Sequence, residues 1–449
     1  MGARQRRGAA TRPASRWPPM IDRLMETPLP ARPGGWRRWS GAPLFSHYNR
    51  LVALVLVANG WFALASLQLP FVDVQVVSQL VMFNLALAIL VRQQYVINGL
   101  FWLATRIPVT WPLCIRRHAA KVYHLGGLHS GGAVAATLWF ALLVGSQGWR
   151  YLQQPHSVSA AWLLVSGALL GMLVLMVVMA QPWIRGRFHN GFERVHRFAG
   201  WAALLLFWAQ TLMAVPQGRL LHAMEFWVLL LLSLSIALPW LRLRRVAVSH
   251  HRPSDHAIVT RLCHTTPFAG SSTAISLQPL LEWHSFANIP APGQPGFRLI
   301  ISRAGDWTGR YIDRLPSHVW VKGITTAGVA NVETLFKSVV YIATGSGIGP
   351  VMPHLLAAQV PIQLVWSTRS PAKTFGAQLV AEIVRAQPDA VIWDTDVRGK
   401  PDLVQLAYAA VQAAGAEAVI CIANQALTRR VVEEMKARGI PAYGAIWDS

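Results

Sequence analysis

The residues best suited to chemistry are the glycines of "GSGIGP", residues 345–350. They follow an apolar, strand-like run and precede a helical segment, and in that setting loop amides and the helix N-terminus face a bound anion. Pro350 can begin the helix, where its missing N–H costs little. The pattern predicts that the phosphates of a dinucleotide contact the loop residues Gly345, Ser346, Gly347, Ile348, Gly349 and Pro350. The alternative interpretation is a bare turn.

The next strand-like run, "IQLVWST", ends in "STRSP". An acidic side chain at this place would bind the ribose hydroxyl of NAD, and "STRSP" contains none. Ser367, Thr368, Arg369 and Lys373 can instead contact a 2′-phosphate, which favours NADPH over NADH. The alternative is a solvated loop.

Three histidines, His124, His129 and His196, lie at the ends of apolar runs. Two imidazoles from facing helices can ligate one haem iron axially. A second pair would lie fourteen residues, about 21 Å, further along each helix. Those places hold the non-ligating residues Leu138, Leu143 and Gln210. The sequence thus allows at most one haem b, on His196 with His124 or His129; the alternative is interfacial histidines that pair with lipid headgroups or Glu193.

The elements that position these residues begin with a membrane part. The chain has 449 residues, of which 53% are hydrophobic and only 13% charged, which is too apolar for an ordinary soluble protein. Six apolar runs, near 51–69, 74–92, 126–146, 160–181, 198–215 and 222–241, approach the roughly 20 residues that cross a bilayer. We expect an α-helical bundle of six spans over residues 45–248.

The basic residues indicate orientation. Lys and Arg number 41 against 19 Asp and Glu, and the excess lies in the N-terminal tail and in the loops on one side of the spans. This pattern places both termini in the cytoplasm and the chain in the inner membrane. Residues 1–44 lack the apolar core of a signal peptide, so we expect a disordered tail that contacts anionic lipid. Nucleic-acid binding is disfavoured because the basic residues are not interleaved with aromatic ones on a soluble patch.

The remaining chain predicts two soluble units. Residues 249–336 contain short alternating segments typical of a small β barrel. Residues 337–449 alternate strand-like and helical segments, which favours a parallel sheet. Cys114, Cys263 and Cys421 are far apart and form no metal-binding spacing.

Six spans with inner histidines, followed by a β barrel and an α/β unit, resemble the ferric-reductase and NADPH-oxidase superfamily with its ferredoxin-NADP reductase module. That resemblance implies an FAD site at "EWHSFANIP", with His284 and Phe286, although Ala287 replaces the expected hydroxyl. It further implies cofactor contacts for "GDWT" and for two single residues: Gly305, Asp306, Trp307, Thr308, Cys421 and Trp447. Trp447 would lie over the flavin and control access of the nicotinamide. The alternatives are a packed terminal position for Trp447 and ordinary barrel packing for His284 and Phe286.

More narrowly, "GDWT", "GSGIGP", "VWSTRSP" and the ending "AYGAIWDS" resemble the TmpA-type integral membrane flavoproteins. Members of that group are associated with adenylation enzymes of the nonribosomal-peptide-synthetase kind, which implies an adenylating partner. The functional hypothesis is a membrane-anchored oxidoreductase that passes hydride from NADPH to FAD. The alternatives are a catalytically silent nucleotide-binding sensor or scaffold and, more weakly, a six-span transporter, for which the spans show no inverted repeat.

Overall fold

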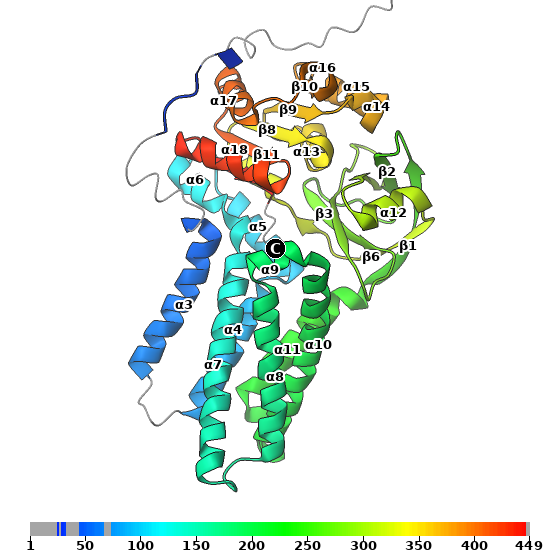
Figure 1. Cartoon of the computed structure of the whole chain (residues 1–449). Coiled ribbons are helices and arrows are strands. Elements are labelled where there is room, and N and C mark those ends of the chain that lie inside the picture. The colour runs from blue at the N-terminus through cyan, green and yellow to red at the C-terminus, as the bar shows by residue number, and fades with distance from the viewer. Residues whose placement is uncertain (1–24, 27, 33–44, 67–72, 446–449) are drawn as a thin grey trace, which may run out of the picture.

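The computed structural model describes residues 25–26, 28–32, 45–66 and 73–445. A helical bundle forms one end of the molecule, and a β barrel and an α/β domain lie together at the other end (Figure 1). The barrel and the α/β domain together are called the soluble module below. Most of the expected N-terminal tail lies outside the described residues.

The bundle and its connections are helical. The helices are α3 (His47–Ser66), α4 (Val74–Leu90), α5 (Gln94–Thr105), α6 (Leu113–Ala119), η2 (Val122–His124), α7 (Gly126–Gln153), α8 (Ala160–Met179), α9 (Pro182–Arg187), α10 (His189–Ala214), η3 (Gln217–His222) and α11 (Met224–Leu241). Among the described residues, four helices (α3, α7, α8 and α11) are long and apolar enough to cross a membrane, and α4 with α5, which meet at 71°, would make a fifth span. The six expected spans are therefore not confirmed. The helix α10 carries charges in its first turns, at Glu193, Arg194 and Arg197.

Helix packing in the bundle relies on small and polar side chains. On α7, a Cβ on Gly127 would lie 2.4 Å from the Tyr48 carbonyl oxygen of α3, so only glycine allows this approach. The Asn59 and Asn84 side chains exchange hydrogen bonds of 3.1 and 2.8 Å between α3 and α4, and Trp139 donates to Asn59. The outer surface of the bundle is apolar, with large exposed side chains on every long helix. Such a surface fits lipid contact.

The barrel begins directly after the bundle. Its strands are β1 (Leu243–His251), β2 (Ala257–Leu262), β3 (Ser271–Ser276), β4 (His284–Ala287), β5 (Phe297–Ser302), β6 (His318–Lys322) and β7 (Thr326–Ala327), with α12 (Asp306–Arg314) between β5 and β6. The sheet order is β4-β3-β6-β1-β2-β5, and β7 pairs with β3. A bridge between Ile289 and Arg298 nearly closes the barrel. Strand β1 crosses the domain boundary expected at 248/249.

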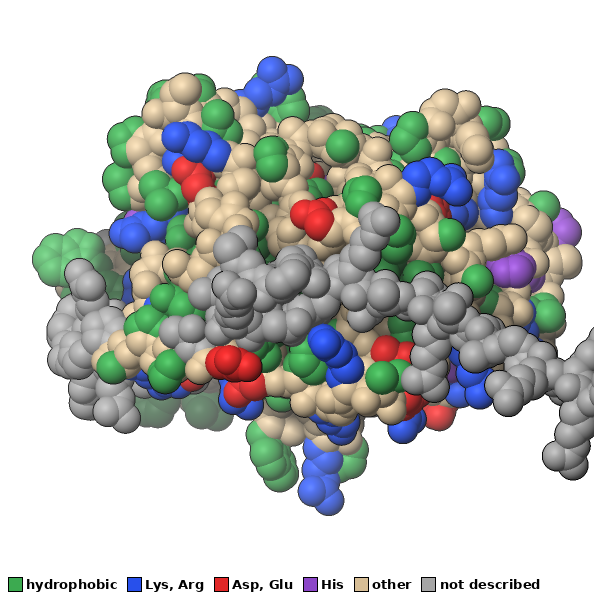
Figure 2. All heavy atoms as spheres, turned by 90° about the horizontal axis from the view of Figure 1, so that it is seen from above, with side chains coloured by type: hydrophobic (Ala, Val, Ile, Leu, Met, Phe, Trp, Pro, Cys, Tyr) green, Lys and Arg blue, Asp and Glu red, His purple; other side chains and the backbone are tan. Residues whose placement is uncertain are grey.

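The α/β domain has the predicted alternation. Its elements are η4 (Val329–Leu335), β8 (Val339–Thr344), η5 (Gly345–Gly347), α13 (Ile348–Ala357), β9 (Ile362–Thr368), α14 (Pro371–Phe375), α15 (Ala377–Ala386), β10 (Val391–Asp394), α16 (Thr395–Arg398), α17 (Leu403–Ala414), β11 (Ala418–Ile422), α18 (Gln425–Ala437) and β12 (Ala442–Gly444). The five strands are parallel in the order β10-β9-β8-β11-β12. Separate apolar cores cover the two faces of the sheet. The outer face of the domain shows Lys and Arg interspersed with Asp and Glu (Figure 2).

The connection between α4 and α7, expected as a cytoplasmic loop, fixes the soluble module to the bundle. We call residues 94–124 the docking segment. In α5, the Asn98 side chain donates to the Thr325 carbonyl oxygen at 2.8 Å and accepts from the Ala327 amide at 2.9 Å. In α6, Arg116 is 3% exposed and contacts the Glu417 carboxylate at 2.7 Å. The segment thus contacts both the barrel and the α/β domain.

Candidate functional site

The glycine loop occupies the point where the strand order reverses. Strand β8 ends at Thr344, and its neighbours β9 and β11 lie on opposite sides. In open parallel sheets, ligands bind at the carboxyl ends of the strands beside such a point. The amides at the start of α13 face the same crevice, as a phosphate site requires. The sequence prediction for residues 345–350 therefore has the required structural setting.

Each of the three glycines in the loop has a different local environment. Gly345 has a φ of +51°, a conformation that side chains disfavour, and its carbonyl oxygen accepts a 2.9 Å hydrogen bond from the Trp366 indole. A Cβ on Gly347 would lie 2.1 Å from the Ile422 carbonyl oxygen of β11, whereas one on Gly349 would lie 3.6 Å from the Ile300 Cβ of the barrel. The loop is therefore held close to both β11 and the barrel. This tight cradle fits a dinucleotide.

The end of β9 has charged neighbours that the sequence analysis missed. Ser367 and Thr368 are buried, at 6% and 7% exposure. Arg369 and Lys373 are both exposed, and Arg369 lies 3.4 Å from a carboxylate oxygen of Asp396. Asp394 accepts a 2.9 Å hydrogen bond from the Ser370 amide. Asp394 is the last residue of β10 and Asp396 follows it, and β10 pairs with β9 in parallel. The carboxyl ends of neighbouring parallel strands lie at the same sheet edge. The acids in "AVIWDTD" could therefore have been predicted to lie beside the end of β9.

The flavin residues inferred from the resemblance come together on the barrel. His284 and Phe286 lie on one face of β4, and their rings stack on Trp307 at 4.1 and 6.1 Å. The His284 Nε2 is buried and has no hydrogen-bond partner among the residues that the structure describes. Burial, with repulsion from Arg197 and Arg310, lowers the pKa of His284 to about 4, so the imidazole is neutral at pH 7. Because Phe286 also packs against the barrel core, these contacts fit ordinary barrel packing as well, and the flavin contact on β4 stays a prediction.

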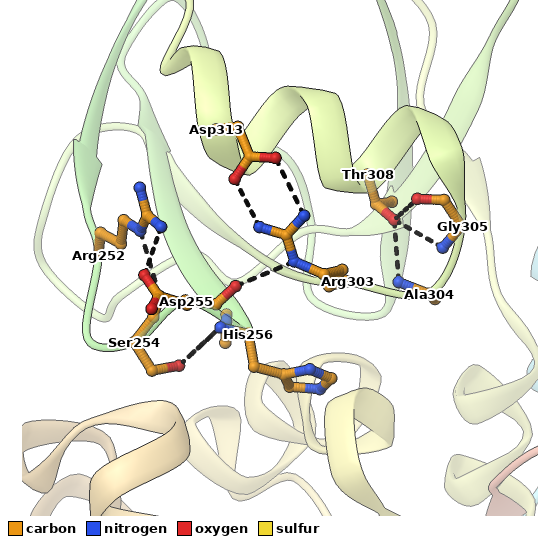
Figure 3. A network of polar contacts seen from close by, with 10 residues as sticks. Arg252, Ser254, Asp255, His256, Arg303, Ala304, Gly305, Thr308 and Asp313 are labelled. Carbon is orange, nitrogen blue, oxygen red and sulfur yellow. Dashed lines mark hydrogen bonds and ion pairs between the residues drawn. The ribbon is translucent and has the colours of Figure 1, made fainter.

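The start of α12 fits a bound pyrophosphate less well (Figure 3). The Thr308 hydroxyl accepts hydrogen bonds of 2.9 and 3.0 Å from the Ala304 and Gly305 amides. Asp306 adds a negative charge in the first turn, where a second anion would be repelled. Trp307 itself is only 5% exposed, inside the barrel core. These residues cap α12 and pack the barrel, and the cofactor contacts that the resemblance implies for them stay a prediction.

The resemblance implies two further cofactor contacts, Cys421 and Trp447. Cys421 is fully buried in β11 and packs with the core on the α17 and α18 side of the sheet. Burial raises the pKa of its thiol to about 12, so the thiol stays protonated at pH 7. Trp447 lies outside the described residues.

Of the three predicted haem ligands, the structure pairs two. The rings of His129 on α7 and His196 on α10 lie side by side in an edge-to-face arrangement, with centroids 6.0 Å apart and an interplanar angle of 72°. The His129 Nδ1 is 2.8 Å from the Ala88 carbonyl oxygen, an arrangement that leaves Nε2 available, as metal-ligating histidines require. His124 instead packs beside His47, with ring centroids 5.7 Å apart. The described residues contain no group of three or more His, Cys, Asp or Glu that could hold a metal ion.

A buried polar network beneath the loop was also missed. Glu333, 1% exposed, accepts from the Tyr341 hydroxyl at 2.9 Å and lies 2.6 Å from the His354 Nδ1. These residues come from η4, β8 and α13, so the network joins the interdomain connection to the helix that follows the glycine loop. A carboxylate within "NVETLF" and a histidine within "VMPHLLA" were the available signals.

Comparison with known proteins gives one family and two named relatives. Residues 329–449 match the family described as "Adenylate-forming reductase 03009, C-terminal domain". The chain is 41% identical over 415 residues to Adenylate-forming reductase 03009 of Coprinopsis cinerea and 39% identical over 416 residues to Adenylate-forming reductase 06235 of the same fungus. Each match covers 90% of this chain and 40% of the relative. This chain therefore spans well under half the length of either relative.

Among solved structures, a ferredoxin NADP+ reductase from Neisseria gonorrhoeae with bound FAD and NADP has a TM-score of 0.36 at 12% identity, covering 46% of this chain and 99% of that one. The flavohem-like FAD/NAD binding domain of nitric oxide dioxygenase from Vibrio cholerae has a TM-score of 0.33 at 14% identity, covering 45% and 98%. Both likenesses extend over less than half of this chain.

Proposed function

We propose that this chain is a membrane-anchored NAD(P)H-dependent flavin oxidoreductase. The observation that carries the proposal is the glycine cradle at the strand-order reversal, where a Cβ on Gly347 would meet β11 at 2.1 Å and one on Gly349 would meet the barrel at 3.6 Å. The printed names of the two relatives, both reductases, support it. So does the aromatic surface of β4 on the adjoining barrel.

In this proposal, the chain's own residues bind and orient the cofactors. The amides of residues 345–349 bind the dinucleotide phosphates, and Arg369 binds a 2′-phosphate, so NADPH is preferred to NADH. Phe286 and neutral His284 contact the flavin on β4. When bound, the flavin supplies the hydride-accepting ring. The docking segment holds the module rigidly over the bundle, which fixes the distance to an acceptor there.

The acceptor is proposed to lie in or near the membrane. The bundle is assigned to the inner membrane as a multi-pass domain with cytoplasmic termini, consistent with the basic docking segment. His129 and His196 would hold at most one haem b, and the resemblance to TmpA-type flavoproteins belongs to this proposal. Because this chain spans 40% of relatives whose names include adenylate formation, an adenylating enzyme serving small-metabolite synthesis is proposed as its partner.

Arg369 provides the test of cofactor choice. Replacing it with Ala removes the exposed cation at the end of β9, so kcat/KM for NADPH should fall about tenfold or more while NADH oxidation changes little. Oxidation of both nucleotides is measured with an artificial acceptor, using the FAD-reconstituted full chain in mild detergent. Arg385→Ala, an exposed cation in the last turn of α15, is the matched control. Equal losses with both nucleotides would contradict the assignment.

A silent nucleotide-binding scaffold is the second candidate function. The observations that favour it are the capped start of α12, with Asp306 where a pyrophosphate would lie, and Ala287 in place of a hydroxyl. Binding of NADPH without oxidation, together with co-purification of an adenylating enzyme, would support this function over catalysis.

A further inference from the structure

The docking segment exposes an unusual number of large apolar side chains. Trp102, Leu103 and Trp111 are 59%, 63% and 48% exposed. The same surface carries the further exposed residues Tyr95, Val96, Val109, Leu113 and Ile115. A shallow apolar groove lined by Ile107, Cys114, Ile115, His118 and Ala119 opens there as well. Clustered apolar side chains of this kind mark an interaction surface.

The opposite face of α5 is already occupied. Gln94 and Asn98 donate to the carbonyl oxygens of Ile324 and Thr325 at 3.4 and 2.8 Å. Phe101 is 5% exposed within the core that α5 shares with the α/β domain. These positions recur every three or four residues, so they share one helix face. Leu103 therefore points away from the soluble module, whereas Trp102, four residues after Asn98, lies at the edge of the occupied face and is exposed.

The bend between α4 and α5 orients this outward face. The two helices meet at 71° across a three-residue break. If α4 runs near the membrane normal, α5 lies within about 20° of the membrane plane. Figure 1 shows α5 and α6 between the bundle and the α/β domain, level with the adjacent ends of α3 and α7. The docking segment thus lies beside this end of the bundle.

The charges of the segment match an anionic leaflet. The Arg106 guanidinium lies 4.8 Å from the centroid of the Trp102 ring, and Arg117 is exposed beside His118. Residues 94–124 contain no Asp or Glu. Tryptophan with arginine at the edge of an apolar surface is typical of helices that lie in the headgroup region. A lipid surface explains both the apolar side chains and the one-sided charge.

We propose that residues 95–118 form an in-plane interfacial patch that inserts into an anionic lipid leaflet and holds the soluble module against the membrane. This proposal rests on the proposed membrane position of the bundle. It goes beyond anchoring by transmembrane helices, because it assigns the connection between α4 and α7 a lipid contact of its own.

The native thiols give a direct test. Cys114 lies within the patch, Cys263 is exposed on the barrel outside it, and Cys421 is buried. Two variants of the full chain are reconstituted in lipid nanodiscs. In Cys263→Ala the label attaches to Cys114, and in Cys114→Ala it attaches to Cys263. The collision rate of each nitroxide is then measured with oxygen, which concentrates in lipid, and with a nickel chelate, which stays in water.

The patch predicts a severalfold higher oxygen-to-nickel collision ratio for the Cys114 label than for the Cys263 label. The ratio should rise further when phosphatidylglycerol is added to phosphatidylcholine discs, and Arg106→Gln should reduce that rise. A chain that enters the discs with both labels equally exposed to water would overturn this proposal alone and leave the patch for a protein partner. A chain that fails to enter the discs would overturn the membrane position as well.

Discussion

Gly347 shows how a single missing side chain determines the candidate site. Its backbone φ of −58° is ordinary, so the residue is not required for conformation. It is required because the loop passes against the end of β11, where a Cβ would meet a carbonyl oxygen at 2.1 Å. Gly345 is the reverse case, with open space around it and a positive φ.

Gly347→Ala should therefore displace the loop and cost about 1–3 kcal/mol of stability, the usual range for overpacking. Affinity for NADPH should fall because the phosphate-binding amides move. Thermal unfolding and nucleotide titration of the full chain in detergent measure both effects. Gly349→Ala is the control, since its Cβ would make an ordinary 3.6 Å contact. Equal behaviour of the two variants would contradict this view of the loop.

Cys421 gives a second prediction at this scale. Burial raises the pKa of its thiol to about 12, and thiolate is the reactive form. In the folded protein in mild detergent at pH 8, a small thiol reagent that enters detergent micelles should therefore react quickly with Cys114 and Cys263 only, both of which are exposed. The third thiol should react after denaturation. Cys421→Ala should leave the number of fast thiols at two; three fast thiols in the native chain would refute the buried position.

At the scale of elements, α6 connects the bundle to the α/β domain through one ion pair. Arg116 donates to Glu417 at 2.7 Å and to the Leu335 carbonyl oxygen at 2.8 Å. Glu417 also accepts from the Lys337 amide at 2.8 Å. The hydrogen bond from Arg116 is the main cause that holds the pKa of Glu417 below its usual range. A short helix thus contacts β11 and the interdomain connection together.

Glu417→Gln should destabilise the docked module by about 1–3 kcal/mol, because Arg116 stays buried without a counter-charge. The lowered pKa means that the native pair stabilises the fold above about pH 4.3, the ordinary glutamate value, and that this stabilisation is lost as the pH falls through the lowered pKa. Thermal unfolding against pH should show that loss in the native chain and not in the variant. Asp313→Asn, which breaks the exposed pair with Arg303, should change little; an equal effect would argue against docking through α6.

At the scale of the whole molecule, the parts of the fold that the sequence predicts are those whose burial leaves a clear apolar pattern along the chain. Strands β8 to β12 are predictable because a parallel sheet covered on both faces leaves continuous apolar runs. The six spans expected from hydropathy are not confirmed. Hydropathy detects the apolar end of α10, but it does not reveal that the same helix begins with charged residues. The bend after α4 and the docking role of Arg116 depend on contacts with residues more than 200 positions away.

The candidate site divides in the same way. The glycine loop is predictable because its function depends on local backbone, strand then loop then helix. Asp396 comes beside Arg369 only through parallel pairing of β9 with β10, and Glu333 meets His354 only across two elements. Thr308 lies where the resemblance implies, but its hydroxyl caps α12. A sequence motif therefore predicts where a residue lies along the chain, whereas its hydrogen-bond partners depend on the tertiary fold.

The most direct test of the central claim is anaerobic addition of NADPH to the FAD-reconstituted full chain in mild detergent, followed by absorption spectroscopy. The account predicts that the flavin bands bleach in proportion to the NADPH added. A change in a Soret band, if one accompanies the bleaching, would assign a haem to His129 and His196. A chain that binds NADPH and retains FAD without bleaching, or that retains no FAD after reconstitution, would contradict the oxidoreductase and favour the scaffold.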